Sequence, residues 1–545
     1  MKNTTQLKKR FFAIASVLAI STAGLVAVPT VARAADPVCT NKVVYTECVG
    51  VTSDSAPYIF QIPAKFSGTF FLFSHGYRYP INIPASIPLV GGYTVTNTPQ
   101  PTGGRNATEI GQVALGMLTK GYGIGGSGFA RQGWNVDSGV KTNVELIGII
   151  KKQFPTVTKV VAWGESLGAF ITQAFSESNP GLINAAGNLC PAAGSPEASL
   201  KLAGDALWGV KTMFDPSIQG GNYKSVLEVY ADIGRVLTVA GAMQAAISAN
   251  PTFPAWPATA TNVPAAIKSA IPSRSALVLV AAMAGVPTQS ASFDGATGPG
   301  PQGTLIATQF AAGISPALGA LENIATAAVL GIMFTYDVEQ QAGGAVFDNE
   351  KTNYTTQLGD GIFEYNSALS GLDAAQTLLA YVAAAPRAKG NDAAIAKMKT
   401  LIAHKGVFNV PTITLGAVAD NATPAGHAQW LAEKAAENYL ASASNKNSKL
   451  AKSFRANHLA LWQRTPDSYT KFSATGSPIP QTGVNGTGHC NITVKQHLAI
   501  ADLLAASAAT GQLVSGGKVL TTIRKAGGIT YARDFSVPLL KYYQN

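Results

Sequence analysis

Between Phe66 and Cys190 the apolar residues follow two alternating periods, that of a strand and that of a helix. Short apolar runs that end at glycine or at a turn indicate strands, and longer segments with apolar residues three and four positions apart indicate helices. Such alternation builds βαβ units, and therefore a parallel sheet that helices cover on both faces. The predicted strands are GTFFLFSHG, YGIGGSG, KVVAW and INAAGNLCPAAG, and the predicted helices are TEIGQVALGMLTKG, SGVKTNVELIGIIKKQF and SLGAFITQAFSESNP.

The pattern changes between Ser195 and His404, where the chain is rich in alanine and its apolar residues follow helical spacing. Long helices are predicted there, interrupted by the glycine- and proline-rich stretch FDGATGPGPQGT, which is expected to form a loop or hinge. The alternation of strands and helices resumes at VFNVPTITLGAVAD and ends with VKQHLAIADLLAASAA. A segment that the same sheet flanks on both sides is an insertion, and a separate helical domain without a part in catalysis is the alternative.

These patterns together predict an α/β fold, with a mostly parallel central sheet flanked by helices and a large, mainly helical cap insertion. The predicted boundaries are residues 1–34 for a signal peptide, 35–194 for the first part of the core, 195–404 for the cap, and 405–545 for the second part of the core.

The first residues have the layout of a secretory signal peptide. Basic residues precede an apolar run, and the small-x-small pattern Ala32-Arg33-Ala34 follows it. An uncleaved membrane anchor is the alternative, because the run from Phe11 to Val28 approaches the roughly 20 apolar residues of a spanning helix. No later segment is expected to be long and apolar enough to span a membrane, the best being ALVLVAAMAGV at 276–286. We therefore expect a secreted protein, in the extracellular or cell-envelope space, without a stable membrane span.

Composition and charge fit a globular chain and give little support to nucleic-acid binding. Hydrophobic residues make up 47% of the chain and charged residues 13%, which suits a protein with a sizeable core. Five of the 40 basic residues and none of the 29 acidic residues lie in 1–34, so removal of this segment lowers the formal charge from +11 to +6. Basic residues do not cluster with aromatic ones, and we predict no nucleic-acid partner.

Four cysteines in an exported chain suggest two disulfides, for which three pairings are possible. Cys39 and Cys48 are close in sequence, and a bond between them would close a short loop or hairpin. Cys190 and Cys490, 300 positions apart, are left as the second pair.

Candidate chemistry is concentrated in the segment AWGESLGAF, residues 162–170, where Ser166 stands between Gly164 and Gly168. This G-x-S-x-G pattern lies between a predicted strand and a predicted helix, as a nucleophile elbow requires. Glycines suit a turn so sharp that the serine takes strained backbone angles. A glycine-rich surface turn is the alternative. In this context we predict that Ser166 is a catalytic nucleophile.

A serine nucleophile needs a histidine to take its proton and a carboxylate to orient that histidine, and after a nucleophile elbow the acid precedes the histidine. Asp420 ends the predicted strand VPTITLGAV, at the sheet edge expected for Ser166; an Asp that only shapes a turn is the alternative. His489 is chosen from the six histidines because it lies in a loop, GVNGTGHCN, before the last long helix. His75 and His404 precede the required position in the chain. The other three, His427, His458 and His497, lie in predicted helices.

The order of His75-Gly76-Tyr77, Gly164-Glu165-Ser166-Leu167-Gly168, Asp420 and Gly488-His489 resembles that of the α/β-hydrolase superfamily, over roughly 65–190 and 405–510. The resemblance implies the fold, a lid or cap made of the intervening helices, and a serine mechanism. It implies no single substrate, because the superfamily includes esterases, lipases, amidases and peptidases. It also assigns the N–H of Tyr77 to the oxyanion hole, beside that of Leu167, the residue after the nucleophile. An ordinary turn after a strand is the alternative at Tyr77.

Two features depart from the superfamily pattern. About seventy residues separate Asp420 from His489, more than a strand–helix–strand interval requires. The pair His489-Cys490 is similar to the ending of the tannase and feruloyl-esterase group, in which a cysteine precedes the nucleophilic serine and bonds to this ending; here Glu165 takes that place. A bridge between Cys190 and Cys490 would hold the histidine loop instead, and two free thiols are the alternative.

We predict a secreted serine hydrolase that cleaves carboxylic esters through an acyl-enzyme intermediate, with Ser166, His489 and Asp420 as its triad. The expected substrate is a small-molecule or polymeric ester with an apolar or aromatic group, because the cap is rich in alanine. No metal or organic cofactor is expected, since His, Cys and carboxylate residues are not clustered at zinc-binding spacing. An amidase or peptidase with the same triad, and a noncatalytic ligand-binding protein on the same scaffold, are the alternatives.

Overall fold

The computed structural model describes residues 36–87, 91–359, 362, 370–443, 457–532 and 534–544. The predicted signal peptide, residues 1–34, lies outside the described residues.

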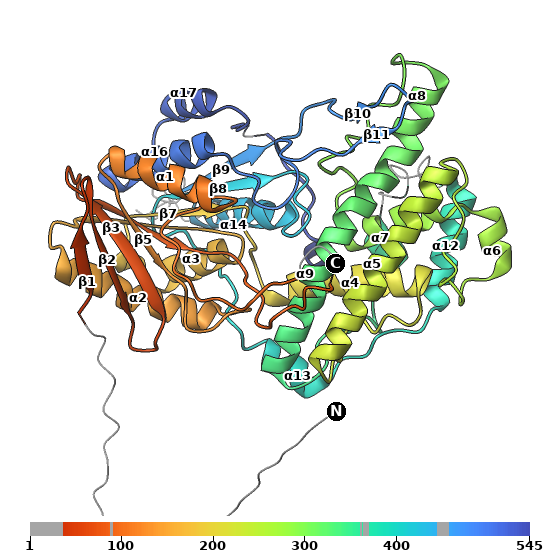
Figure 1. The fold of residues 1–545 in the computed structure, drawn as a ribbon, viewed down its shortest axis with the longest axis horizontal. Coiled ribbons are helices and arrows are strands. Elements are labelled where there is room, and N and C mark those ends of the chain that lie inside the picture. Colours follow the sequence, from red (N-terminus) through yellow and green to blue (C-terminus); the bar gives the residue numbers. More distant parts are fainter. Residues whose placement is uncertain are drawn as a thin grey trace, which may run out of the picture.

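The first and last parts of the chain build one nine-stranded sheet, in the order β1-β2-β3-β5-β4-β6-β7-β8-β9 (Figure 1). The strands from β5 to β9 in this order are parallel, and β3, β2 and β1 extend the sheet on one side by antiparallel pairing. Their bounds are β1 (Val38–Asn41), β2 (Tyr45–Val51), β3 (Pro57–Pro63), β4 (Thr69–Ser74), β5 (Gly123–Ser127), β6 (Lys159–Glu165), β7 (Ala185–Leu189), β8 (Thr412–Ala417) and β9 (His458–Gln463).

Helices cover both faces of the sheet, as the alternation along the chain predicts. One face carries α1 (Ala107–Thr119), α16 (Val494–Thr510) and α17 (Gly516–Ala526), and the other carries α2 (Val136–Gln153), α3 (Leu167–Ser178) and α14 (Gly426–Ala443). The central strands β6, β7 and β8 are buried almost throughout, because both of their faces meet helices. Central strands of this kind have continuous apolar sequences, and this explains why β4 and β6 were predictable from short apolar runs. The predicted fold class is confirmed.

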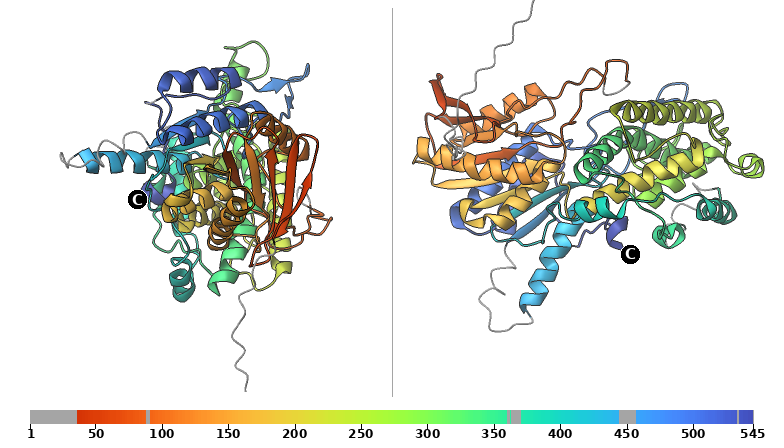
Figure 2. Two further views of the ribbon diagram at one scale, coloured as in Figure 1. Left: turned by 90° about the vertical axis from the view of Figure 1, so that its left-hand side faces the viewer. Right: turned by 90° about the horizontal axis from the view of Figure 1, so that it is seen from below.

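The segment between β7 and β8 contributes no strand to the described sheet and folds as a helical cap. Its helices lie beside the sheet (Figures 1 and 2), and most of them pack around an apolar core of their own. They are α4 (Pro196–Phe214), α5 (Val226–Ala249), α6 (Ala265–Ala270), α7 (Ser273–Ala284), α8 (Leu305–Gln309), the π-helical turn η2 (Phe310–Ile314), α9 (Ser315–Ala342), α10 (Tyr354–Leu358), α12 (Leu372–Ala384) and α13 (Asp392–Met398).

The remaining elements are short. A 3₁₀ turn, η1 (Pro180–Leu182), precedes β7, and α18 (Lys541–Gln544) is the last described helix. A two-stranded hairpin of β10 (Lys471–Phe472) and β11 (Pro478–Ile479) follows β9.

Two expectations from the sequence are wrong. His458 was expected in a helix but begins β9, where Leu459 and Leu461 alternate into the core; so short an apolar run fits either period. The expectation that no later segment could span a membrane is also wrong, because the continuous helical run Leu305–Ala342 is long and apolar enough by length and composition. Most of this run is buried inside the structure, so it also fits the core helix of a globular protein.

Candidate active site

Ser166 occupies the turn between β6 and α3, with φ 58° and ψ −123°. Positive φ is strained for a residue with a side chain, and the tight turn is kept by its flanking glycines. A Cβ atom at Gly168 would collide with the carbonyl oxygen of Ser74 on β4, and one at Gly164 would collide with that of Gly168. The sequence therefore specifies a turn in which the serine hydroxyl stands at the carboxyl end of the parallel strands.

His489 and Asp420 lie next to this hydroxyl, although both are far from it in sequence. The Nε2 atom of His489 is 2.7 Å from the Oγ atom of Ser166. The Nδ1 atom of His489 is 2.9 Å and 3.0 Å from the two carboxylate oxygens of Asp420. Asp420 is fully buried and also accepts hydrogen bonds from the backbone N–H groups of Ala422 and Thr423. The three predicted triad residues thus form one continuous hydrogen-bonded chain.

Backbone pairing brings the two loops together despite the long interval between them. Ala419, next to Asp420, forms an isolated parallel bridge with Thr487, two residues before His489. Within the interval, α14, β9 and the hairpin of β10 and β11 occupy most of the described residues. The extra length is therefore placed beside the site and does not separate the acid from the histidine.

The surroundings of His489 favour its protonated form. Burial lowers the pKa of His489, but the charge and hydrogen bond of Asp420, together with the charge of Glu165, outweigh burial and raise it above 6.5. By contrast, burial lowers the pKa of His75 to about 3 and that of His404 and His427 to about 4. His489 thus differs from His75, His404 and His427 in that its pKa is raised and not lowered, because it has a carboxylate partner.

The two residues predicted to supply an oxyanion hole, Leu167 and Tyr77, line the same cavity as Ser166. Leu167 begins α3 directly after the serine, and Tyr77 follows Gly76 in the loop after β4. This loop is in close contact with Ser166, because a Cβ atom at Gly76 would lie 3.2 Å from the Cβ atom of Ser166. Within the described part of the chain, the N–H groups of Leu167 and Tyr77 donate no hydrogen bond to protein acceptors.

Both predicted disulfides are present, and one of them adjoins the histidine. Cys190, directly after β7, is bonded to Cys490, directly after His489. Cys39 is bonded to Cys48, its directly opposed partner in the pairing of β1 with β2. The bond between Cys190 and Cys490 ties the loop of His489 to β7, the neighbour of the strand β6 that precedes Ser166.

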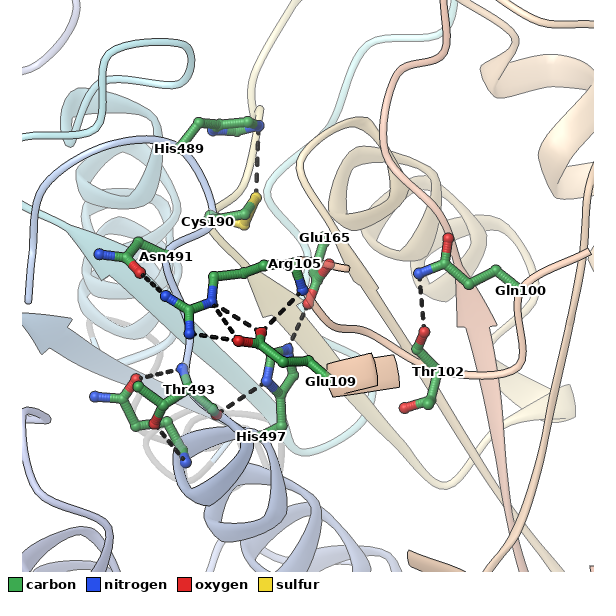
Figure 3. Close-up of polar contacts among 12 residues, drawn as sticks. Gln100, Thr102, Arg105, Glu109, Glu165, Cys190, His489, Asn491, Thr493 and His497 are labelled. Carbon is green, nitrogen blue, oxygen red and sulfur yellow. Dashed lines mark hydrogen bonds and ion pairs between the residues drawn. A yellow bond between two sulfur atoms is a disulfide. The ribbon is translucent and has the colours of Figure 1, made fainter. Parts of the chain in front are cut away.

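Three contributors to the site were not found from the sequence. Thr423 donates its hydroxyl to the carbonyl of Cys190, 3.0 Å away, and lies 3.2 Å from a carboxylate oxygen of Asp420. Glu165, adjacent to Ser166, pairs with the fully buried His497 of α16 at 2.5 Å (Figure 3). The spacing of Asp420 and Thr423 is a local turn signal, whereas the contact of Glu165 with His497 spans 332 positions and has no local signal.

A second network holds the histidine loop from the side of α1. Arg105 donates to the side-chain oxygen of Asn491 at 2.7 Å and pairs with Glu109 (Figure 3). The other ring nitrogen of His497, Nδ1, donates to the carbonyl oxygen of Thr493 at 3.0 Å. The contact of Arg105 with Asn491 and the disulfide at Cys490 thus hold the loop at two adjacent residues.

A cavity opens at Ser166 and continues between residues of the cap. None of its lining side chains is Asp, Glu, Lys or Arg. The described residues contain no group of three or more His, Cys, Asp or Glu side chains that could hold a metal ion.

No protein-family model and no curated protein matches this chain. Among solved structures it is similar to feruloyl esterase B from Aspergillus oryzae, at 12% identity over 88% of this chain and 84% of that one, with a TM-score of 0.36. It is also similar to an esterase from Aspergillus oryzae, at 11% identity over 77% and 71%, with a TM-score of 0.34. The rice cell wall degrading esterase LipA from Xanthomonas oryzae is similar at 11% identity over 80% and 92%, with a TM-score of 0.29. With its helix-flanked parallel sheet, its serine elbow after β6 and its cap between β7 and β8, the chain has the α/β-hydrolase fold.

Proposed function

We propose that this protein is a serine hydrolase that cleaves carboxylic esters through an acyl-enzyme intermediate. One observation carries the proposal: the Oγ atom of Ser166 is 2.7 Å from the Nε2 atom of His489, whose Nδ1 atom is 2.9 Å from Asp420. Nucleophile, base and orienting acid are in hydrogen-bond reach of one another, the arrangement that activates a serine hydroxyl.

Each residue has a role in this mechanism. Ser166 attacks the ester carbonyl while its proton passes to the Nε2 atom of His489, and Asp420 stabilises the imidazolium that forms. The N–H groups of Leu167 and Tyr77 hold the negative charge that develops on the carbonyl oxygen. His489 then returns the proton to the leaving alcohol, and water, activated by the same histidine, releases the acid from Ser166.

The lining of the cavity supports an ester with an apolar acid part. It is built mainly from alanine, leucine, valine and aromatic side chains, and it has no charged carboxylate, ammonium or guanidinium group to bind a charged peptide. The two disulfides support action outside the reducing cytosol, in line with the expected secretion.

Covalent labelling tests the serine mechanism. A fluorophosphonate probe should label the wild-type protein, and Ser166→Ala should abolish the labelling. Ser199→Ala is the matched control, because Ser199 lines the same cavity and should leave labelling intact. A wild-type protein that takes up no probe, although it is folded, would instead favour a noncatalytic binding protein.

A comparison of p-nitrophenyl esters with the matching anilides tests the bond that is cleaved. The ester should be hydrolysed faster, because p-nitrophenolate is a better leaving group than p-nitroanilide and the cavity lining has no charged side chain that would bind a peptide. Faster turnover of the anilide would identify an amidase or peptidase.

A further inference from the structure

The cavity at Ser166 is a passage between two cap helices. One wall is α4, which contributes Ser199, Leu202, Ala203, Ala206, Leu207 and Val210, and the facing wall is α9, which contributes Ile324, Ala327, Ala328, Leu330, Gly331 and Phe334. The mouth is formed by core residues, including Ser166, Leu167 and Thr423. The cavity is therefore continuous from the nucleophile into the cap.

The direction of the passage follows from the apolar clusters to which its walls belong. Phe334 packs in one cluster with Leu167 and Trp134 of the core, at the end near Ser166. Val210 and Ile324 belong to the cluster that forms the centre of the cap. Phe334 and Ile324 are ten positions apart on α9, which at a rise of about 1.5 Å per residue gives a passage of about 15 Å.

Small side chains line the middle of this passage. Ala203 and Ala206 of α4 and Ala327, Ala328 and Gly331 of α9 are among its lining residues. The two helices touch at this level, because a Cβ atom at Gly331 would lie 3.2 Å from that of Ala203, so the space beside this contact is narrow. The space is thus long and bounded by small apolar groups, which suits a chain of methylene groups better than a short, broad aromatic ring.

We propose that this passage binds the acyl chain of the substrate, and that the enzyme prefers esters of unbranched fatty acids of about ten to twelve carbons, from about 1.3 Å per methylene in an extended chain. The proposal rests on the proposed ester hydrolysis and names its substrate class. Burial of each further methylene in such a site should strengthen binding about fourfold. Selectivity for chain length therefore follows directly from the length of the passage.

Matched substitutions on α9 test the proposal. With p-nitrophenyl esters from butanoate to hexadecanoate, wild-type kcat/KM should be highest at the decanoate or dodecanoate. Ala327→Phe places a ring in the passage and should lower the ratio of kcat/KM for dodecanoate over butanoate at least tenfold. Ala325→Phe is the control, because Ala325 lies two residues away on α9 and lines a different cavity; its ratio should stay within twofold of wild type. An unchanged ratio in Ala327→Phe, or a wild-type preference for butanoate or hydroxycinnamoyl esters, would overturn the proposal.

A second variant and a binding measurement separate this proposal from the chemistry. Ala206→Phe narrows the passage from α4 and should also lower the ratio of kcat/KM for dodecanoate over butanoate. It takes the place of Ala327→Phe if that variant does not fold. Calorimetric titration of the Ser166→Ala protein with dodecanoate should show one binding site per chain, weakened at least tenfold by adding either phenylalanine. Binding without hydrolysis of any ester would retain the passage and reject the proposed function, whereas hydrolysis without binding or chain-length selectivity would reject the passage alone.

Discussion

Ser166 adopts backbone angles that cost a side-chain-bearing residue on the order of 1–3 kcal/mol. The elements on both sides offset this cost: its N–H donates to the carbonyl of Leu189 on β7, and its carbonyl accepts from Ala169 and Phe170 of α3. At the same scale, Glu165 places a carboxyl beside the nucleophile, where it meets the imidazole of His497 and acts on the pKa of His489. Two adjacent residues thus have different effects on the site: Ser166 carries the backbone strain and the hydroxyl, and the charge of Glu165 raises the pKa of His489.

The raised pKa of His489 predicts how activity depends on pH. His489 accepts the proton of Ser166 only when it is neutral, so kcat/KM should fall as pH decreases through its pKa, with the midpoint of the acid limb above 6.5. Glu165→Gln removes a negative charge that raises this pKa, and the acid limb should move to lower pH.

The control for this prediction is Glu109→Gln. Glu109 belongs to the neighbouring network on α1, but its charge is not among the groups that raise the pKa of His489. A pH profile that shifts equally in both variants, or an acid limb below 6.5 in the wild type, would contradict the assignment.

At the scale of elements, β7 links the turn at Ser166 to the loop of His489. Its backbone pairs with both β6 and β8, and Cys190 at its end is bonded to Cys490 beside His489. This bond closes a loop with a sequence separation of 300, whereas that of Cys39 with Cys48 is 9. In the chain-entropy model, the longer loop contributes more to stability.

We predict that Cys190→Ala/Cys490→Ala lowers the free energy of unfolding by about 2–4 kcal/mol and also lowers kcat, because the histidine loop loses its tie to β7. Cys39→Ala/Cys48→Ala should cost less and leave kcat unchanged, since this pair lies in the β1–β2 hairpin. Urea unfolding and ester hydrolysis measure the two effects. Equal losses in both double variants would show that the position of the bond is irrelevant to the site.

Local patterns predicted most elements of the core but not the contacts between them. The buried strands β4 and β6 have continuous apolar sequences, and Ser166, Asp420 and His489 could be selected by motif, strand end and chain order. The same reasoning assigned His458 to a helix, because a run of six residues does not distinguish the two periods. The contact between Glu165 and His497 could not be predicted, since it depends on how α16 packs against β6.

At the scale of the whole molecule, one buried carboxylate joins the cap to the core. Asp337 on α9 accepts a hydrogen bond from the backbone N–H of Trp134 at 2.5 Å and another from the hydroxyl of Tyr77 at 3.3 Å. A Cβ atom at Gly133 would collide with this carboxylate, so the core loop is shaped to receive it. The cap is therefore fixed to the loop that supplies the proposed oxyanion N–H.

We predict that Asp337→Ala lowers the free energy of unfolding by about 1–3 kcal/mol, because the N–H of Trp134 is left buried without an acceptor. It should also lower kcat, since Tyr77 loses a contact that holds its loop. Glu350→Ala, which removes an exposed ion pair with Lys389 on the cap, is the control and should change neither quantity measurably. The prediction fails if the two variants are equally stable and equally active.

Because the cap is inserted between β7 and β8, the strands of the sheet are synthesised in two groups that are separated in time. β7 ends at Leu189 and its neighbour β8 begins at Thr412, so a nascent chain carries an uncovered strand edge while the whole cap is being made. At about 5–20 residues per second this delay lasts tens of seconds, and a bare edge of this kind is prone to aggregation. Productive biogenesis of the protein should therefore depend on chaperones that shield the half-built sheet until its last two parallel strands emerge.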